Sequence, residues 1–147
     1  MTSEYLRQRI WSAKQQCDKL EREIGEKSSE LEKLRTLSAQ IRNSESSFLE
    51  TCARYSATAQ RMSALDHSPR AQSGYVQSLK GFLSGQDYRH AQDCFRIMKS
   101  RGVKMEEKSE HELWRKKQEL AHAKAELSNL YKQLEAAISQ ENAQGTA

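Results

Sequence analysis

The residues best suited to chemistry are the histidines and cysteines, and their spacing argues against a shared site. The histidines are His67, His90, His111 and His122. No two of them lie three or four residues apart, which is the spacing that places two metal ligands on one helix face. His111 follows Glu107 by one helical turn, but no nucleophile motif, glycine loop or paired-carboxylate pattern accompanies them. The sequence therefore gives no positive support for an enzyme, a metal site or a cofactor.

The cysteines point to reduced thiols. Cys17, Cys52 and Cys94 are widely spaced and include no Cys-x-x-Cys pair, so neither a zinc site nor a disulfide framework is indicated. Two of them fall on an apolar stripe, where Cys behaves as a small hydrophobic residue. Residues 1–14 carry charges throughout, so we expect no cleaved signal peptide, and no segment is apolar enough to span a membrane. These features predict a cytoplasmic protein; export, if it occurs, would use a route that reads no cleaved signal.

The composition predicts long helices rather than a globular core. Of 147 residues, 36% are hydrophobic and 30% are charged, with a single proline. The net charge of +4 is spread over alternating acidic and basic residues, and the longest basic run is only Arg115-Lys116-Lys117. Binding to nucleic acid is therefore a minor alternative, and it would show an affinity that falls steeply with salt.

The apolar periodicity divides the chain into helical segments. We predict a helix over 3–62, a loop and short helix over 63–83, a turn at 84–85, a helix over 86–138 and a disordered tail over 139–147. Ser68-Pro69 would begin the short helix, and Ser84 with Asp87 forms a capping signature at the turn. The expected fold is all-α: one elongated domain over 1–147, built as a long antiparallel helical hairpin or coiled coil that reverses at Ser84-Gly85, with the short middle helix before that turn.

Each long helix carries one narrow apolar stripe. Its residues recur at steps of three and four, and four leucines of the second long helix are spaced by sevens. The predicted partner interface consists of Ile10, Leu20, Ile24, Leu113, Leu120, Leu127 and Leu134. Gly102 lies on the same stripe and marks a bend where another chain approaches closely. Because neither stripe can be buried by its own helix, we expect an oligomer or a complex.

Two short motifs resemble those of a known family. Leu83-Ser84-Gly85 follows Phe82 between two helical segments, and Tyr131 precedes Glu135 by four residues near the end of the last helix. Together they resemble the Trp-Xaa-Gly helical hairpins of bacterial type VII secretion, especially the larger hairpin proteins that accompany LXG toxins. In that comparison Leu83 stands at the tryptophan position. The residues assigned to the turn motif are Phe82, Leu83, Gly85, Tyr88 and Phe95, and Tyr131 with Glu135 corresponds to the Tyr-x-x-x-Asp/Glu export signal.

The resemblance implies a non-catalytic partner or targeting chaperone. Such a protein pairs with the helical N-terminal region of an LXG toxin, or with a second small hairpin protein, and presents it for export. A homo-oligomer is an alternative assembly. Another is a coiled-coil adaptor or scaffold of a different complex, such as the stalk-like hairpins of type III secretion.

Overall fold

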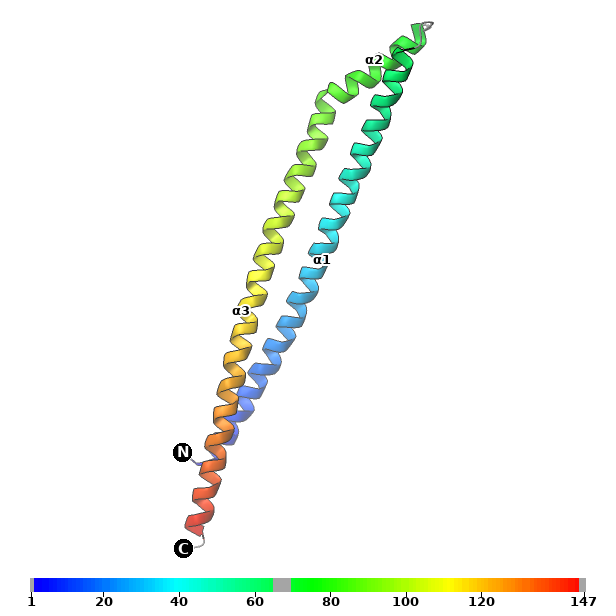
Figure 1. The fold of residues 1–147 in the computed structure, drawn as a ribbon. Helices are drawn as coiled ribbons and strands as arrows, with labels where there is room; N and C mark the ends of the chain where they lie inside the picture. The colour runs from blue at the N-terminus through cyan, green and yellow to red at the C-terminus, as the bar shows by residue number, and fades with distance from the viewer. Residues whose placement is uncertain (1, 65–69, 146–147) are drawn as a thin grey trace. The chain divides into compact units, whose positions relative to one another are not determined.

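The computed structural model describes residues 2–64 and 70–145, and within these residues the chain is helical and contains no strand (Figure 1). The three helices are α1 (Ser3–Ser63), α2 (Arg70–Ser84) and α3 (Gln86–Gly145). The all-α prediction is confirmed. Ser68-Pro69, the expected start of the short helix, lies outside the described residues. Among the helices described, none combines the length and the apolar character that crossing a membrane requires.

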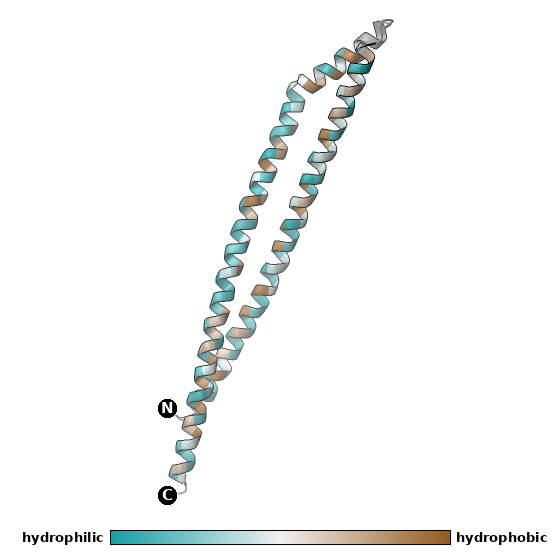
Figure 2. Ribbon diagram, viewed as in Figure 1, coloured by the Kyte–Doolittle hydropathy of each residue, from teal (hydrophilic) through white to brown (hydrophobic). Residues whose placement is uncertain are grey.

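The long helices alternate apolar and polar residues along their length, as Figure 2 shows by the brown and teal bands on α1 and α3. α1 begins at a cap in which Thr2 Oγ1 accepts a hydrogen bond from the Tyr5 backbone N–H at 3.3 Å, with Glu4 in the first turn. The chain forms two compact units: unit 1 comprises Met1–Glu32 with Glu107–Ala147, and unit 2 comprises Lys33–Glu106. We describe each unit separately.

Unit 1 holds the main hydrophobic cluster. Leu6, Ile10, Leu130 and Ala137 are buried together, and Ala13, Leu127 and Leu134 pack against them. Polar contacts between α1 and α3 pair Ser3 with Glu141, Arg9 with Glu126, Glu23 with Lys116 and Lys27 with Glu112. Residue numbers in these pairs rise along α1 as they fall along α3.

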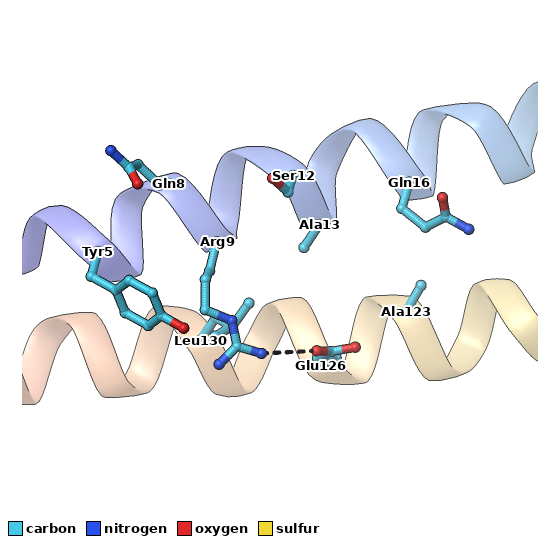
Figure 3. Close-up of a pocket in the computed structure, with 9 residues that line it drawn as sticks. All are labelled: Tyr5, Gln8, Arg9, Ser12, Ala13, Gln16, Ala123, Glu126 and Leu130. Atoms are coloured by element: carbon cyan, nitrogen blue, oxygen red, sulfur yellow. Dashed lines mark hydrogen bonds and ion pairs between the residues drawn. The ribbon is translucent and has the colours of Figure 1, made fainter. Parts of the chain in front are cut away.

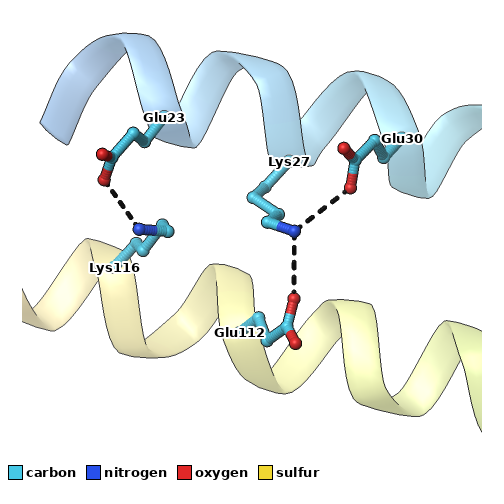
Figure 4. A network of polar contacts seen from close by, with 5 residues as sticks. All are labelled: Glu23, Lys27, Glu30, Glu112 and Lys116. Atoms are coloured by element: carbon cyan, nitrogen blue, oxygen red, sulfur yellow. Dashed lines mark hydrogen bonds and ion pairs between the residues drawn. The ribbon is translucent and has the colours of Figure 1, made fainter. Parts of the chain in front are cut away.

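Away from the apolar cluster, unit 1 is joined by a polar ladder (Figure 4). Lys116 Nζ lies 2.7 Å from Glu23 Oε2, and Lys27 Nζ lies 3.1 Å from Glu112 Oε2 and 3.3 Å from Glu30 Oε2. These side chains are 27–58% exposed and therefore reach solvent, so each pair gains modest energy on its own. The ladder therefore specifies which residues face each other more than it stabilises the fold.

The predicted disordered tail over 139–147 differs from the structure. α3 continues to Gly145, so residues 139–145 are helical. Ala, Gln and Glu in this stretch favour helix, and Glu141 is held by two hydrogen bonds to Ser3. The small polar residues of this stretch suggest a frayed end, but in the structure residues 139–145 are helical.

In unit 2 the predicted reversal at Ser84-Gly85 is instead a bend. Phe82 on α2 contacts Tyr55 of α1, with ring centroids 6.5 Å apart. Beyond Gly85, Tyr88 and Phe95 both contact Phe48 of α1, at 5.8 and 5.7 Å. The same long helix is thus contacted on both sides of Gly85. Ser84-Gly85 is thus a break between α2 and α3, which both contact α1, and the chain reverses before Phe82. The predicted N-cap is corrected, because the Ser84 hydroxyl donates back to the Lys80 carbonyl of α2 at 2.7 Å.

Candidate protein-interaction surface

Most of the predicted partner interface is occupied within the chain itself. Ile10 and Leu20 are buried, at 6% and 3% exposed. Ile24, Leu113, Leu120, Leu127 and Leu134 are half-buried. Ile10, Leu127 and Leu134 belong to the cluster that joins α1 to α3 in unit 1. These residues stabilise the helix pair, so the assignment of Ile10 and Leu20 to an accessible partner surface is corrected.

The residues of the candidate export signal are both exposed on α3. Tyr131 and Glu135 lie one helical turn apart, which places them on one face. Lys14 of α1 reaches across to Tyr131, with its Nζ 5.5 Å from the centroid of the Tyr131 ring. The pKa of Lys14 is raised, first by its hydrogen bond to Tyr131. No local pattern predicts Lys14 in this role, because the contact joins residues of different helices.

The turn-motif residues belong to an aromatic cluster in unit 2. Phe82, Tyr88 and Phe95 contact one another or the α1 residues Phe48 and Tyr55. Leu83 is half-buried. At Gly85 a Cβ atom would lie only 2.6 Å from the Gly81 carbonyl oxygen, so the bend requires glycine for lack of space rather than for a positive φ.

Besides the aromatic contacts of Phe48 with Tyr88 and Phe95, the long-helix stretches of unit 2 are sparsely packed. From residue 33 to 51 on α1 and from 86 to 106 on α3, no described residue is buried. The large apolar side chains that are 40–53% exposed in these two stretches are Leu37, Leu49, Ile97, Met98, Val103 and Met105. Polar contacts occupy positions where a core would lie: Lys99 pairs with Glu45 at 2.8 Å, and Ser38 donates to Glu106 at 2.6 Å. We call this part of unit 2 the open face.

A groove of about 370 Å³ runs along the open face. The residues that line it include Ile41, Arg42, Arg96, Lys99, Ser100 and Val103. Arg96 pairs with Asp93 at 2.9 Å, and Lys99 pairs with Glu45. Arg42 forms no ion pair with any other described residue, so the groove has an excess of positive charge.

A second groove, of about 420 Å³, lies in unit 1 (Figure 3). Tyr5, Gln8, Ser12 and Gln16 line it from α1, and the Arg9–Glu126 ion pair, at 3.4 Å, links α1 to α3 there. Its polar groups are amides, hydroxyls and one ion pair. Such a groove can form hydrogen bonds with another chain, but it offers no nucleophile with an adjacent base.

The thiols and metal-binding side chains form no reactive site in the part of the chain that the structure describes. Cys17 and Cys52 are buried free thiols, and Cys94 is half-buried with its Sγ 3.7 Å from His90 Nε2. No group of three or more His, Cys, Asp or Glu residues within 2–64 and 70–145 could hold a metal ion.

Comparison of the chain with family models, with curated proteins and with solved structures found no match.

Proposed function

We propose that this protein is an antiparallel helical hairpin that binds another helical protein and performs no catalysis of its own. The observation that supports the proposal is the open face of unit 2. Two helices face each other there without one buried side chain, while six large apolar residues are 40–53% exposed. Exposed apolar side chains that line a groove, as Val103 does here, are typical of interaction sites.

The energetic argument favours a helical partner. Each large apolar side chain moved from water into a packed interface contributes roughly 1.5 to 3 kcal/mol. A helix pair gains little stability from helix propensity alone, and most of its stability comes from burying an apolar face. A third helix laid along the groove of the open face would bury Ile41 and Val103 and so stabilise unit 2.

We further propose that the partner is the helical N-terminal region of an LXG-type toxin and that the complex assembles in the cytoplasm for type VII export. Support comes from the resemblance at Leu83-Ser84-Gly85 and from the placement of Tyr131 and Glu135 on one exposed face. In this proposal the Tyr131–Glu135 face is read by the export machinery while unit 2 holds the client.

The test is an affinity pull-down of the tagged full chain from its native cell, followed by mass spectrometry. Recovery of a larger protein with a helical N-terminal region and a toxin-like C-terminal domain is the expected result. The double variant Met98→Glu/Val103→Glu should lose it. Lys104→Glu, which changes an exposed residue between Val103 and Met105, is the matched control and should retain it. Recovery of the chain alone would instead indicate a self-associating scaffold.

The export step needs its own test. Tyr131→Ala should abolish export of the client without weakening the pull-down, and Tyr131→Phe, which keeps the ring under Lys14, separates loss of the hydroxyl from loss of the ring. If Tyr131→Ala leaves export undiminished, the proposed export signal is wrong, and the proposal that unit 2 binds the client still stands.

A further inference from the structure

We propose that the groove of the open face binds one amphipathic helix of another protein whose apolar stripe is bordered by acidic residues. The inference rests on the proposed function and deepens it by naming the surface and the chemistry of the occupant.

The groove combines the two features that such a helix would need. Ile41 and Val103 line it with apolar surface, and Val103 is 45% exposed. Arg42, Arg96 and Lys99 line the same groove with cationic groups. An amphipathic helix places its apolar stripe in a groove and presents its bordering residues to the rim.

The charges in the groove determine which charge should border the apolar stripe of the occupant. Asp93 and Glu45 neutralise Arg96 and Lys99, at 2.9 and 2.8 Å. Arg42 has no such counter-ion among the described residues, so a carboxylate on the occupant would complete its ion pair. Arginine suits this role because its guanidinium can form two parallel hydrogen bonds with a carboxylate. A basic border would instead place like charges together.

The same charges disfavour a second copy of this chain as the occupant. In a two-fold symmetric dimer the same patch meets itself. Arg42, which has no counter-ion among the described residues, would then lie near the Arg42 of the other copy, and like charges repel at close range. In the open face, the α1 stretch 33–51 is 19 residues or about 28 Å long, so a single helix of similar length can lie along it.

The probes are two stapled helical peptides of roughly this length that share one leucine stripe. One carries glutamates beside the stripe, and the other carries lysines. With the full chain, measured by fluorescence anisotropy, the acidic peptide should bind about tenfold more tightly or better, and added NaCl should shrink the preference. Arg42→Glu/Arg96→Glu should reverse it, whereas Arg101→Glu/Lys104→Glu, an equal change of charge at residues that do not line the groove, should preserve it.

Several results would overturn the inference. Equal binding of the two peptides, binding of neither, or an effect of Arg42→Glu/Arg96→Glu no larger than that of the control would each remove the acidic helix as occupant. A dimer in analytical ultracentrifugation that Val103→Glu converts to a monomer would replace it with a second copy. If a client is still captured in a Met98- and Val103-dependent way while neither peptide binds, this inference fails and the proposed function stands. Circular dichroism confirms that each variant stays helical.

Discussion

The carboxylate of Glu141, near the end of α3, accepts two hydrogen bonds from Ser3, at the start of α1. The Ser3 backbone N–H donates to Oε1 at 3.0 Å, and the Ser3 hydroxyl donates to Oε2 at 2.9 Å. The first N–H groups of a helix have no partner within the helix, and a negative charge there complements the helix dipole. A residue 138 positions away thus contributes to capping α1.

Glu141→Gln should loosen the first turn of α1 while the rest of the chain stays folded. Gln keeps one acceptor oxygen but removes the charge and one of the two hydrogen bonds. Hydrogen exchange should show faster exchange at residues 3–6 and unchanged exchange around Leu20. Glu135→Gln, which changes an exposed glutamate of α3 that is not bonded to Ser3, is the control. Equal protection in both variants would mean that the contact does not hold the end of α1.

Stability should fall in acid as the polar ladder is protonated. Hydrogen bonds to Lys116, Lys27 and Ser3, respectively, lower the pKa values of Glu23, Glu112 and Glu141. A carboxyl whose pKa is lower in the folded state stabilises the fold above the ordinary carboxyl pKa of about 4.3 and loses that contribution as the pH falls below it.

The measurement is the Tm by circular dichroism between about pH 6 and 3, at low and high NaCl. We expect Tm to fall with pH, less steeply in high salt because the pairs are solvent-accessible. Glu112→Gln should show a smaller fall than the unaltered chain. A Tm that does not change with pH would mean that these pairs contribute nothing to the fold.

Gly102→Ala should gain less than a helix-interior glycine usually does. A Cβ at Gly102 would lie 3.1 Å from Ser38 Oγ, whose hydroxyl is bonded to Glu106. At Gly25 nothing lies within 4 Å of the added Cβ, so Gly25→Ala should raise the free energy of unfolding by about 0.5–1 kcal/mol. Gly102→Ala should give little or no gain, and adding Ser38→Ala should recover it. A full gain from Gly102→Ala alone would contradict the close approach.

Ser109→Ala should stabilise unit 1. Ser109 is 7% exposed, and its hydroxyl has no hydrogen-bond partner in the described structure. A buried hydroxyl without a partner is unfavourable, so its removal should raise the free energy of unfolding by roughly 1–2 kcal/mol in urea titrations. Ser29→Ala, at an exposed position of α1, should gain only about 0.5 kcal/mol from helix propensity. A destabilised Ser109→Ala would show that the hydroxyl has a partner, such as a water molecule.

Gly85→Ala should destabilise unit 2 even though alanine favours helix. The added Cβ would lie 2.6 Å from a backbone oxygen, so the backbone must shift, at about 1–3 kcal/mol by analogy with overpacking. Gly81→Ala, one turn earlier, meets nothing within 4 Å and should be neutral or stabilising. The shift should also separate Phe82 from Tyr55, which aromatic circular dichroism can detect. Equal stability of the two variants would show that the bend adapts freely.

Structural features that depend on neighbouring residues could be predicted from the sequence, whereas contacts between distant residues could not. The stripes containing Ile10 and Leu127 are local periodicities, so the helical class and the approximate extent of α1 could be predicted from them. The partner of Glu141 lies at the other end of the chain, and no local pattern records it. Ser84 and Gly85 predict that a helix ends there, but these residues do not determine whether the chain then reverses or only bends.

The groove of the open face could not be predicted from the sequence, for a related reason. Stripe residues were assumed to be available to a partner, yet Ile10 and Leu20 are already buried between α1 and α3. Val103 lies outside the stripe, so periodicity gave no reason to choose it. Its significance depends on how little of unit 2 is buried, which only the three-dimensional arrangement reveals. At Gly102 the sequence predicts a close approach by another chain, whereas the close neighbour in the structure is Ser38 of α1 in the same chain.

The polar ladder of unit 1 also fixes the register of its two helices. Glu23 faces Lys116, and Lys27 faces Glu112, so the signs alternate along both helices. Sliding one helix by a turn of four residues would place Glu23 opposite Glu112 in one direction and Lys27 opposite Lys116 in the other. Each slipped alignment brings like charges together. Narrow apolar stripes tolerate such slippage, and the alternating charges penalise it in both directions.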